Sequence, residues 1–112
     1  MKLMDEPFGR LQEGVKKIEL RLFDEKRQLL GLGDEIEFVR LAAPEEKVRV
    51  EVVGLLRYRT FAELIDDVPA SFLGYEDTEK DYLKSSMYEI YTPEDEANYG
   101  VLGIRMKLLP AA

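Results

Sequence analysis

The stretch Lys17-Ile-Glu-Leu-Arg-Leu22 alternates apolar and charged residues without a break. Because successive side chains of a strand point to opposite faces, its three aliphatic side chains share one face and its three charged side chains share the other. The pattern therefore predicts a half-buried strand. The same alternation returns in Lys47-Val-Arg-Val-Glu-Val52, the clearest strand signal of the chain, and in Glu35-Ile-Glu-Phe-Val39.

Two further strands are expected near the ends of the chain, over residues 2–4 and 101–109. The strand that begins at residue 47 is expected to continue to residue 59 through a β-bulge at Gly54, since an isolated glycine in a strand often marks one. Residues 43–46 predict a turn. The connections after Leu22 and Val39 are short enough to join antiparallel neighbours.

Short helices are expected between the strands. Residues 7–13 begin with a proline, which suits a first helical turn, and are followed by Gly14, which suits a C-terminal cap. Residues 79–91 predict a longer helix, whose apolar face is formed by Leu83, Met87, Ile90 and Tyr91.

Capping side chains mark the remaining helices. Asp24, Thr60 and Thr92 are expected to cap helices over residues 25–30, over residues 61–67 and from residue 93 onward. Residues 69–73 are expected to add one more helical turn. All these elements predict a single α+β domain over residues 1–112, an antiparallel sheet of five or six strands curled like a barrel, with helices over its openings.

Composition excludes several kinds of chemistry. The 112 residues include neither cysteine nor histidine, so a zinc site of the usual kind and a Ser-His-Asp or Cys-His triad are both excluded. Any general base must be Asp, Glu, Lys, Tyr or a water that one of them holds. No metal ion or other cofactor is expected. The first residues lack an apolar signal sequence and no apolar run is long enough to span a membrane, so a cytoplasmic protein without a membrane partner is expected.

The net charge of −7 is unevenly distributed. Residues 1–62 carry 12 acidic and 12 basic residues, whereas residues 63–98 carry 11 acidic and two basic residues. A chain this acidic is not a general polyanion binder, so contact with nucleic acid needs a local basic patch. The candidate patch is residues 10–27, where six basic residues accompany four acidic ones.

Three charged residues of the first strand motif are candidates for a binding site. Glu19 and Arg21 lie two residues apart on one strand face, and Lys16 precedes the strand. Arginine can hold a phosphate or carboxylate with two hydrogen bonds, and glutamate can accept one from an exocyclic amine such as that of cytosine. The alternative is that Lys17, Glu19 and Arg21 form an ordinary solvated face with weak ion pairs.

The segment Gly14-Val-Lys16-Lys-Ile-Glu19-Leu-Arg21 resembles the G-x-K-x-x-E-x-R signature of ASCH domains, which belong to the PUA-like superfamily. Pro7-Phe8 before the motif, Gly33-Asp34 before a strand and Tyr99-Gly100-Val101 before the last strand are also similar to the family pattern. The resemblance implies a distorted antiparallel β-barrel with several short helices. It also implies a cleft beside the motif strand that binds RNA or modified nucleosides.

One branch of that family hydrolyses the acetyl amide of N4-acetylcytidine and related nucleosides. Its lysine matches Lys16 and its distant glutamate best matches Glu76, but position 19 is Glu where that branch has threonine. The resemblance therefore implies Lys16, Glu19 and Glu76 as candidate catalytic residues. Lys17, Arg21, Tyr75 and Tyr99 are candidate ligand-binding residues, the two tyrosines by stacking on a base.

Three functions remain open at this point. The first is a binding module for RNA, a nucleoside or a nucleotide, in which Glu19 reads an amine and the two cations hold phosphate or carbonyl oxygen. The second is a metal-free amidohydrolase with Lys16 as base. The third is an interaction protein that meets a basic partner through its acidic residues 63–98. For Glu76 and Asp77, the alternative is a purely structural role at a helix start, and for the tyrosines it is packing.

Overall fold

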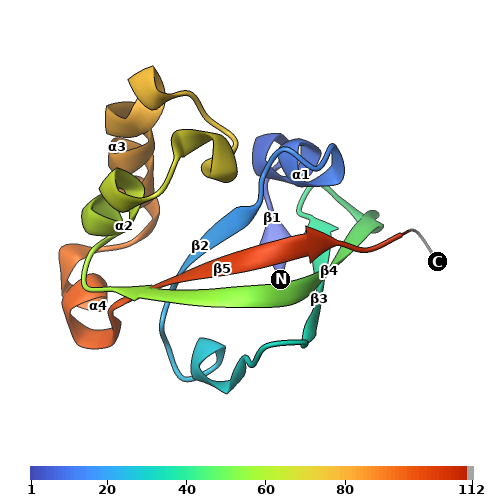
Figure 1. The fold of residues 1–112 in the computed structure, drawn as a ribbon, viewed down its shortest axis with the longest axis horizontal. Helices are drawn as coiled ribbons and strands as arrows, with labels where there is room; N and C mark the ends of the chain where they lie inside the picture. The colour runs from blue at the N-terminus through green and yellow to red at the C-terminus, as the bar shows by residue number, and fades with distance from the viewer. Residues whose placement is uncertain (111–112) are drawn as a thin grey trace.

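Five strands form one curved sheet in the computed structural model, which describes residues 1–110 (Figure 1). The strands are β1 (Lys2–Leu3), β2 (Ile18–Leu22), β3 (Glu35–Arg40), β4 (Ala43–Tyr58) and β5 (Val101–Leu108). Their order in the sheet is β1-β3-β4-β5-β2, and every pair is antiparallel except β1 with β3. The predicted α+β, barrel-like antiparallel sheet is thus confirmed as a half-barrel. The expected domain also includes residues 111–112, which lie outside the described part.

The position of β2 differs from the prediction. A short connection after Leu22 favoured β2 beside β3, but β2 instead pairs with β5 at the edge of the sheet. The reason is that residues 23–34 do not form a hairpin. Phe23 and Leu30 in this segment pack against buried core residues, so the connection runs across the sheet and its apolar residues complete the core.

The hairpin between β3 and β4 is also tighter than expected. The predicted turn over residues 43–46 is wrong, because these residues already belong to β4 and Ala43 is the register partner of Arg40. The chain instead turns at residues 41–42.

Four α-helices accompany the sheet within residues 1–110: α1 (Asp5–Gln12), α2 (Phe61–Asp67), α3 (Lys80–Ile90) and α4 (Pro93–Tyr99). Short 3-10 turns span Arg27–Leu29, Ala70–Leu73 and Asp77–Glu79. The expected caps are present, since Thr60 Oγ1 accepts the Glu63 N–H at 3.0 Å and Thr92 Oγ1 accepts the Asp95 N–H at 3.1 Å. None of the helices in the described part is long and apolar enough to cross a membrane.

Some helix boundaries and faces differ from the predictions. Helix α1 starts two residues before Pro7, and the helix expected over residues 25–30 is only a 3-10 turn, although Asp24 still accepts the Arg27 N–H at 3.0 Å. Ile90, predicted on the apolar face of α3, is 59% exposed at the last position of the helix, where the ring of Tyr91 instead stacks on Phe61 with 5.1 Å between the ring centroids.

Two hydrophobic clusters cover opposite faces of the sheet. The first lies on the face covered by α1, called here the α1 face, and includes Phe8, Leu11, Phe38, Val50, Val52, Leu102 and Ile104. The second lies between the other face and helices α2 and α3, and includes Ile18, Leu20, Leu22, Phe61, Leu64, Leu83 and Val101. Strand β2 is therefore enclosed on both faces. Its aliphatic side chains are buried as predicted, but its charged side chains do not form the solvent-exposed face that a half-buried strand would have.

A β-bulge at Gly54 changes which residues of β4 face α1. The register of β4 against β5 shifts between Val52 and Gly54, as predicted. A β-carbon at Gly54 would lie 3.1 Å from the Cβ of Arg105, so this crossing favours glycine. Because the bulge adds one residue, Leu55 and Arg57 follow Val52 onto the α1 face.

Candidate functional site

The loop between α1 and β2 fixes the position of Lys16. Gly14 has φ 77°, which reverses the chain after α1 as predicted for a glycine cap. The backbone N–H groups of Val15 and Lys16 then both donate to the carbonyl of Arg10, at 2.9 and 3.1 Å. On the other side, Lys17 donates its N–H to Phe72 O at 2.8 Å and accepts from Met106 N–H at 2.9 Å. Lys16 is therefore held where α1, β2 and β5 meet.

Glu19 lies between two cations on the α1 face. It is the register partner of Ile104, and Arg21 is the partner of Leu102, so both side chains lie on the face of those core residues. Lys16 Nζ is 3.3 Å from Glu19 Oε1, and Arg21 Nη2 is 3.2 Å from Glu19 Oε2. The three side chains, called here the Glu19 network, are 9%, 6% and 15% exposed for Lys16, Glu19 and Arg21.

The carboxylate of Glu19 stays charged despite its burial. Burial alone raises its pKa, but the charges of Lys16 and Arg21 and a hydrogen bond from Leu20 N–H at 2.9 Å together lower the pKa below its ordinary value. The network is therefore a carboxylate held between an ammonium and a guanidinium, rather than the solvated strand face that was the alternative interpretation.

Both cations keep donors that this network does not use. Arg21 Nη2 donates to Glu19 and also to Lys2 O at 3.0 Å, which ties edge strand β2 to edge strand β1. Its Nη1 and Nε donate to no acceptor within residues 1–110. A lysine ammonium has three donors, and Glu19 takes one of those of Lys16. The site can thus offer several N–H donors to an acceptor-rich group.

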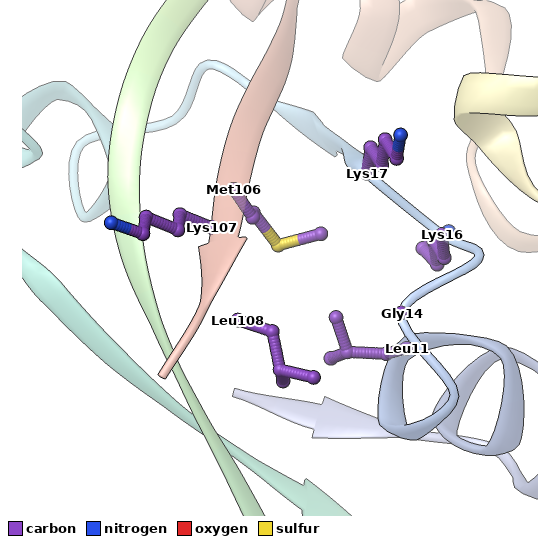
Figure 2. A pocket seen from close by; sticks show the side chains of 7 residues that line it. All are labelled: Leu11, Gly14, Lys16, Lys17, Met106, Lys107 and Leu108. Atoms are coloured by element: carbon purple, nitrogen blue, oxygen red, sulfur yellow. The ribbon is translucent and has the colours of Figure 1, made fainter. Parts of the chain in front are cut away.

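A hollow of about 250 Å³ opens beside Lys16, between α1 and the end of β5. Figure 2 shows the side chains of Leu11, Met106 and Leu108 directed into this space, whereas those of Lys17 and Lys107 point away from it. The hollow thus has an apolar wall with a charged edge. The contributions of Leu11, Met106 and Leu108 had no signal in the sequence, because the end of β5 reaches α1 only in the folded chain.

Lys17 does not join the network. It precedes the first residue of β2, so the alternation that places Glu19 and Arg21 has not yet begun. Its Nζ instead lies 5.6 Å from the ring centroid of Phe72, a residue that packs on the second hydrophobic cluster. Lys17 therefore lines the hollow close to its backbone, while its ammonium group lies toward the other face of the sheet.

The remaining candidate residues lie elsewhere. Tyr75 and Glu76 line a different hollow, which shares no lining residue with the one beside Lys16. Tyr75 lies under the guanidinium of Arg10, at 4.1 Å from its ring centroid, and Glu76 precedes a 3-10 turn with its N–H bonded to Glu79 Oε1 at 2.9 Å. Tyr99 packs against the second hydrophobic cluster near the C-terminal end of β2, whereas Lys16 precedes the N-terminal end of that strand.

No metal centre is formed by the described residues, since nowhere within residues 1–110 do three acidic side chains gather closely enough to hold an ion. What the Glu19 network offers is hydrogen bonding. It combines one carboxylate acceptor with two cationic donors, and one of these donors, Lys16, lines the apolar hollow.

Comparisons with known proteins agree on the nature of this fold. A family model described as the ASCH domain matches residues 1–110. The crystal structure of hypothetical protein PH0355 has a TM-score of 0.81 and 27% identity, covering 97% of this chain and 96% of that one. The solution structure of protein PF0455 from Pyrococcus furiosus has a TM-score of 0.63 and 27% identity, covering 99% and 100%. No protein with curated annotation matches the chain.

Proposed function

The chain belongs to the ASCH domain family, PUA-like domains that are generally linked to RNA binding, and we propose that its Glu19 network binds one nucleotide, free or within RNA. The observation that carries this proposal is the burial of three charged side chains where packing alone would favour apolar ones. A buried ion pair contributes little net stability compared with hydrophobic residues of similar volume. Its retention beside a hollow therefore supports a role in binding.

The donors and acceptors of the network suit a pyrimidine nucleotide with an exocyclic amine. Arg21 and Lys16 can donate to phosphate or to a base carbonyl, and Glu19 can accept from an amine such as N4 of cytosine. The apolar wall formed by Leu11 and Met106 can pack on the base. A volume of about 250 Å³ is below the ~300–1,000 Å³ of pockets for drug-sized ligands, so one base or nucleotide is the matching size.

The local charge also supports an anionic ligand. The network carries two positive charges and one negative charge, although the whole chain has a net charge of −7. Lys17 and Lys107 also line the hollow, although their ammonium groups point away from it (Figure 2). The net positive charge of the network beside a hollow of an acidic protein favours a phosphate-bearing ligand there, while the acidic remainder of the chain disfavours polyanions elsewhere.

Arg21→Gln tests the proposal by calorimetric titration with cytidine 5′-monophosphate. We expect at least a tenfold loss of affinity, about 1.4 kcal/mol, because the substitution removes charge-assisted hydrogen bonds to the ligand. The matched control is Arg49→Gln, since Arg49 also pairs with a glutamate, Glu35, at 3.2 Å but on an exposed part of the sheet. Equal affinities for the two variants, or no binding by the unmodified protein, would reject the proposal.

Deacetylation of N4-acetylcytidine remains a separate prediction. Of the three residues it invokes, Lys16 and Glu19 are in contact, whereas Glu76 lines the other hollow. The measurement is incubation with N4-acetylcytidine followed by chromatography, with Lys16→Ala as the comparison. Cytidine formed above the level of that variant supports the hydrolase, and equal levels dismiss it. The interaction of residues 63–98 with a basic protein likewise remains a prediction, for a salt-sensitive pull-down to test.

A further inference from the structure

A second group of basic residues lies on the same sheet face as the Glu19 network. Leu102 is the register partner of Arg57 on one side and of Arg21 on the other, so the three residues form one row across β4, β5 and β2. Neighbouring strands are about 4.8 Å apart, which places the backbones of Arg57 and Arg21 about 10 Å apart. The bulge at Gly54 is what directs Arg57 to this face.

The connection between β2 and β3 brings two more cations to this row. Phe23 packs on the core of the α1 face, and the guanidinium of Arg57 lies 3.8 Å from its ring centroid. Lys26 and Arg27 lie in the turn that follows Phe23, which a hydrogen bond from Gln28 Nε2 to Phe23 O closes at 3.0 Å. Burial lowers the pKa of the Met1 amino group, and the charges of Arg21, Lys26 and Arg27 lower it further, which agrees with this grouping. We call Arg21, Lys26, Arg27 and Arg57 the Arg57 cluster.

The positive charge of this cluster is only partly neutralised. Arg27 pairs with Asp24 at 3.1 Å, and Arg21 shares Glu19 with Lys16. Lys26 and Arg57 are exposed and form no ion pair with an acidic side chain within residues 1–110. Two cations without protein partners, one of them resting on an aromatic ring, form a surface suited to phosphate and to a stacked base.

We propose that the Arg57 cluster binds the backbone phosphates of a single-stranded RNA whose neighbouring nucleotide occupies the Glu19 network. This inference rests on the proposed function, because Arg21 belongs to both groups. From Ile18 to Arg21 the strand rises about 10 Å, so a ligand at Lys16 reaches the cluster by extending along β2. An RNA strand can therefore contact both the Glu19 network and the Arg57 cluster, whereas a free nucleotide at Lys16 contacts only the network.

The test compares two double variants with equal change in charge. Lys26→Gln with Arg57→Gln removes the two unpaired cations, and Lys47→Gln with Arg49→Gln removes two exposed cations of β4 that pair with glutamates of β3. Binding of a fluorescent RNA hexamer and of cytidine 5′-monophosphate is measured from about 0.05 to 0.2 M salt. Each neutralised phosphate contributes about 0.7 to the slope of log K against log salt for a single strand.

For the hexamer, we expect the Lys26/Arg57 variant to have a slope shallower by about 1.4 than the unmodified protein, with nucleotide affinity retained. The Lys47/Arg49 variant should keep the original slope. Equal slopes for the two variants overturn the inference, as does a hexamer that binds no tighter than the nucleotide. In either case, binding of cytidine 5′-monophosphate by the unmodified protein leaves the proposed function standing. If the unmodified protein binds neither the hexamer nor the nucleotide, both the proposed function and this inference are rejected.

Discussion

Replacing Glu19 with alanine is expected to lower the free energy of unfolding by about 3–5 kcal/mol, because the substitution leaves buried charges without a counter-charge. Lys16 and Arg21 are 9% and 15% exposed and have their closest acidic partner in Glu19. The truncation also frees the Leu20 N–H. Urea denaturation followed by circular dichroism measures the effect, and nucleotide titration of the same variant should show weakened binding.

The matched control for this experiment is Glu35→Ala. Glu35 pairs with Arg49 at 3.2 Å, the same distance as between Glu19 and Arg21, but its side chain is 58% exposed. An exposed ion pair contributes about 0–1 kcal/mol, so this variant should unfold almost like the unmodified protein. A Glu19→Ala variant that is no less stable than Glu35→Ala would show that the buried network does not hold β2 in place.

Protonation of Glu19 is expected to destabilise the protein at low pH. The pKa of Glu19 in the folded protein lies below its ordinary value of 4.5, since Lys16, Arg21 and a backbone hydrogen bond outweigh the effect of burial. Its contribution to stability is therefore complete above about pH 4.5 and is lost as the pH falls through the folded-state pKa. A glutamine does not titrate, so the unfolding free energy of Glu19→Gln should fall less than that of the unmodified protein as the pH is lowered from about 5. Parallel curves of unfolding free energy against pH would contradict the lowered pKa of Glu19.

The second large effect is expected at Glu96, a buried carboxylate in α4. Its Oε2 accepts the N–H of Phe61 at 2.9 Å and the hydroxyl of Tyr88 at 2.7 Å, so it joins the start of α2 to α3. Hydrogen bonds to a charged group contribute about 1.5–3 kcal/mol each, and Glu96→Ala leaves both donors without this partner. We expect a loss of about 3 kcal/mol in unfolding free energy, measured by urea denaturation.

A double-mutant cycle with Tyr88→Phe separates the two hydrogen bonds. Burial and the contact with Glu96 raise the pKa of Tyr88, which agrees with a hydroxyl that donates to a carboxylate. Tyr88→Phe alone should cost about 1–2 kcal/mol, and should cost nothing further once Glu96 is alanine. Additive losses would mean that the two residues act independently.

Several parts of the fold followed from local chemistry alone. The alternation from Lys17 to Leu22 predicted β2, the hydroxyl of Thr60 predicted the start of α2, and the glycine at position 54 predicted the bulge in β4. These features depend on side-chain direction, on a helix terminus or on backbone conformation, which neighbouring residues decide. For the same reason the spacing of Glu19 and Arg21 correctly placed the two side chains on one face.

The candidate site was predictable only in part. Lys16, Glu19 and Arg21 lie within six residues, and the structure brings them together over this short separation. Tyr75, Glu76 and Tyr99 were linked to them through the family pattern, with no local constraint on distance. Tyr75 and Glu76 lie between two 3-10 turns in a segment that packs on the other face of the sheet, and both line the second hollow.

The sequence by itself determined which residues of β2 share a face, where α2 and α4 begin and which side-chain chemistry is absent. Only the tertiary structure decided what covers each face, because alternation reports the direction of a side chain and not the element packed against it. Strand β2 joined β5 rather than β3 since the apolar residues of the segment after Leu22 gained more by packing on the core than by forming a hairpin. That choice enclosed Glu19 beneath α1 and turned an ordinary charged strand face into a buried ion network.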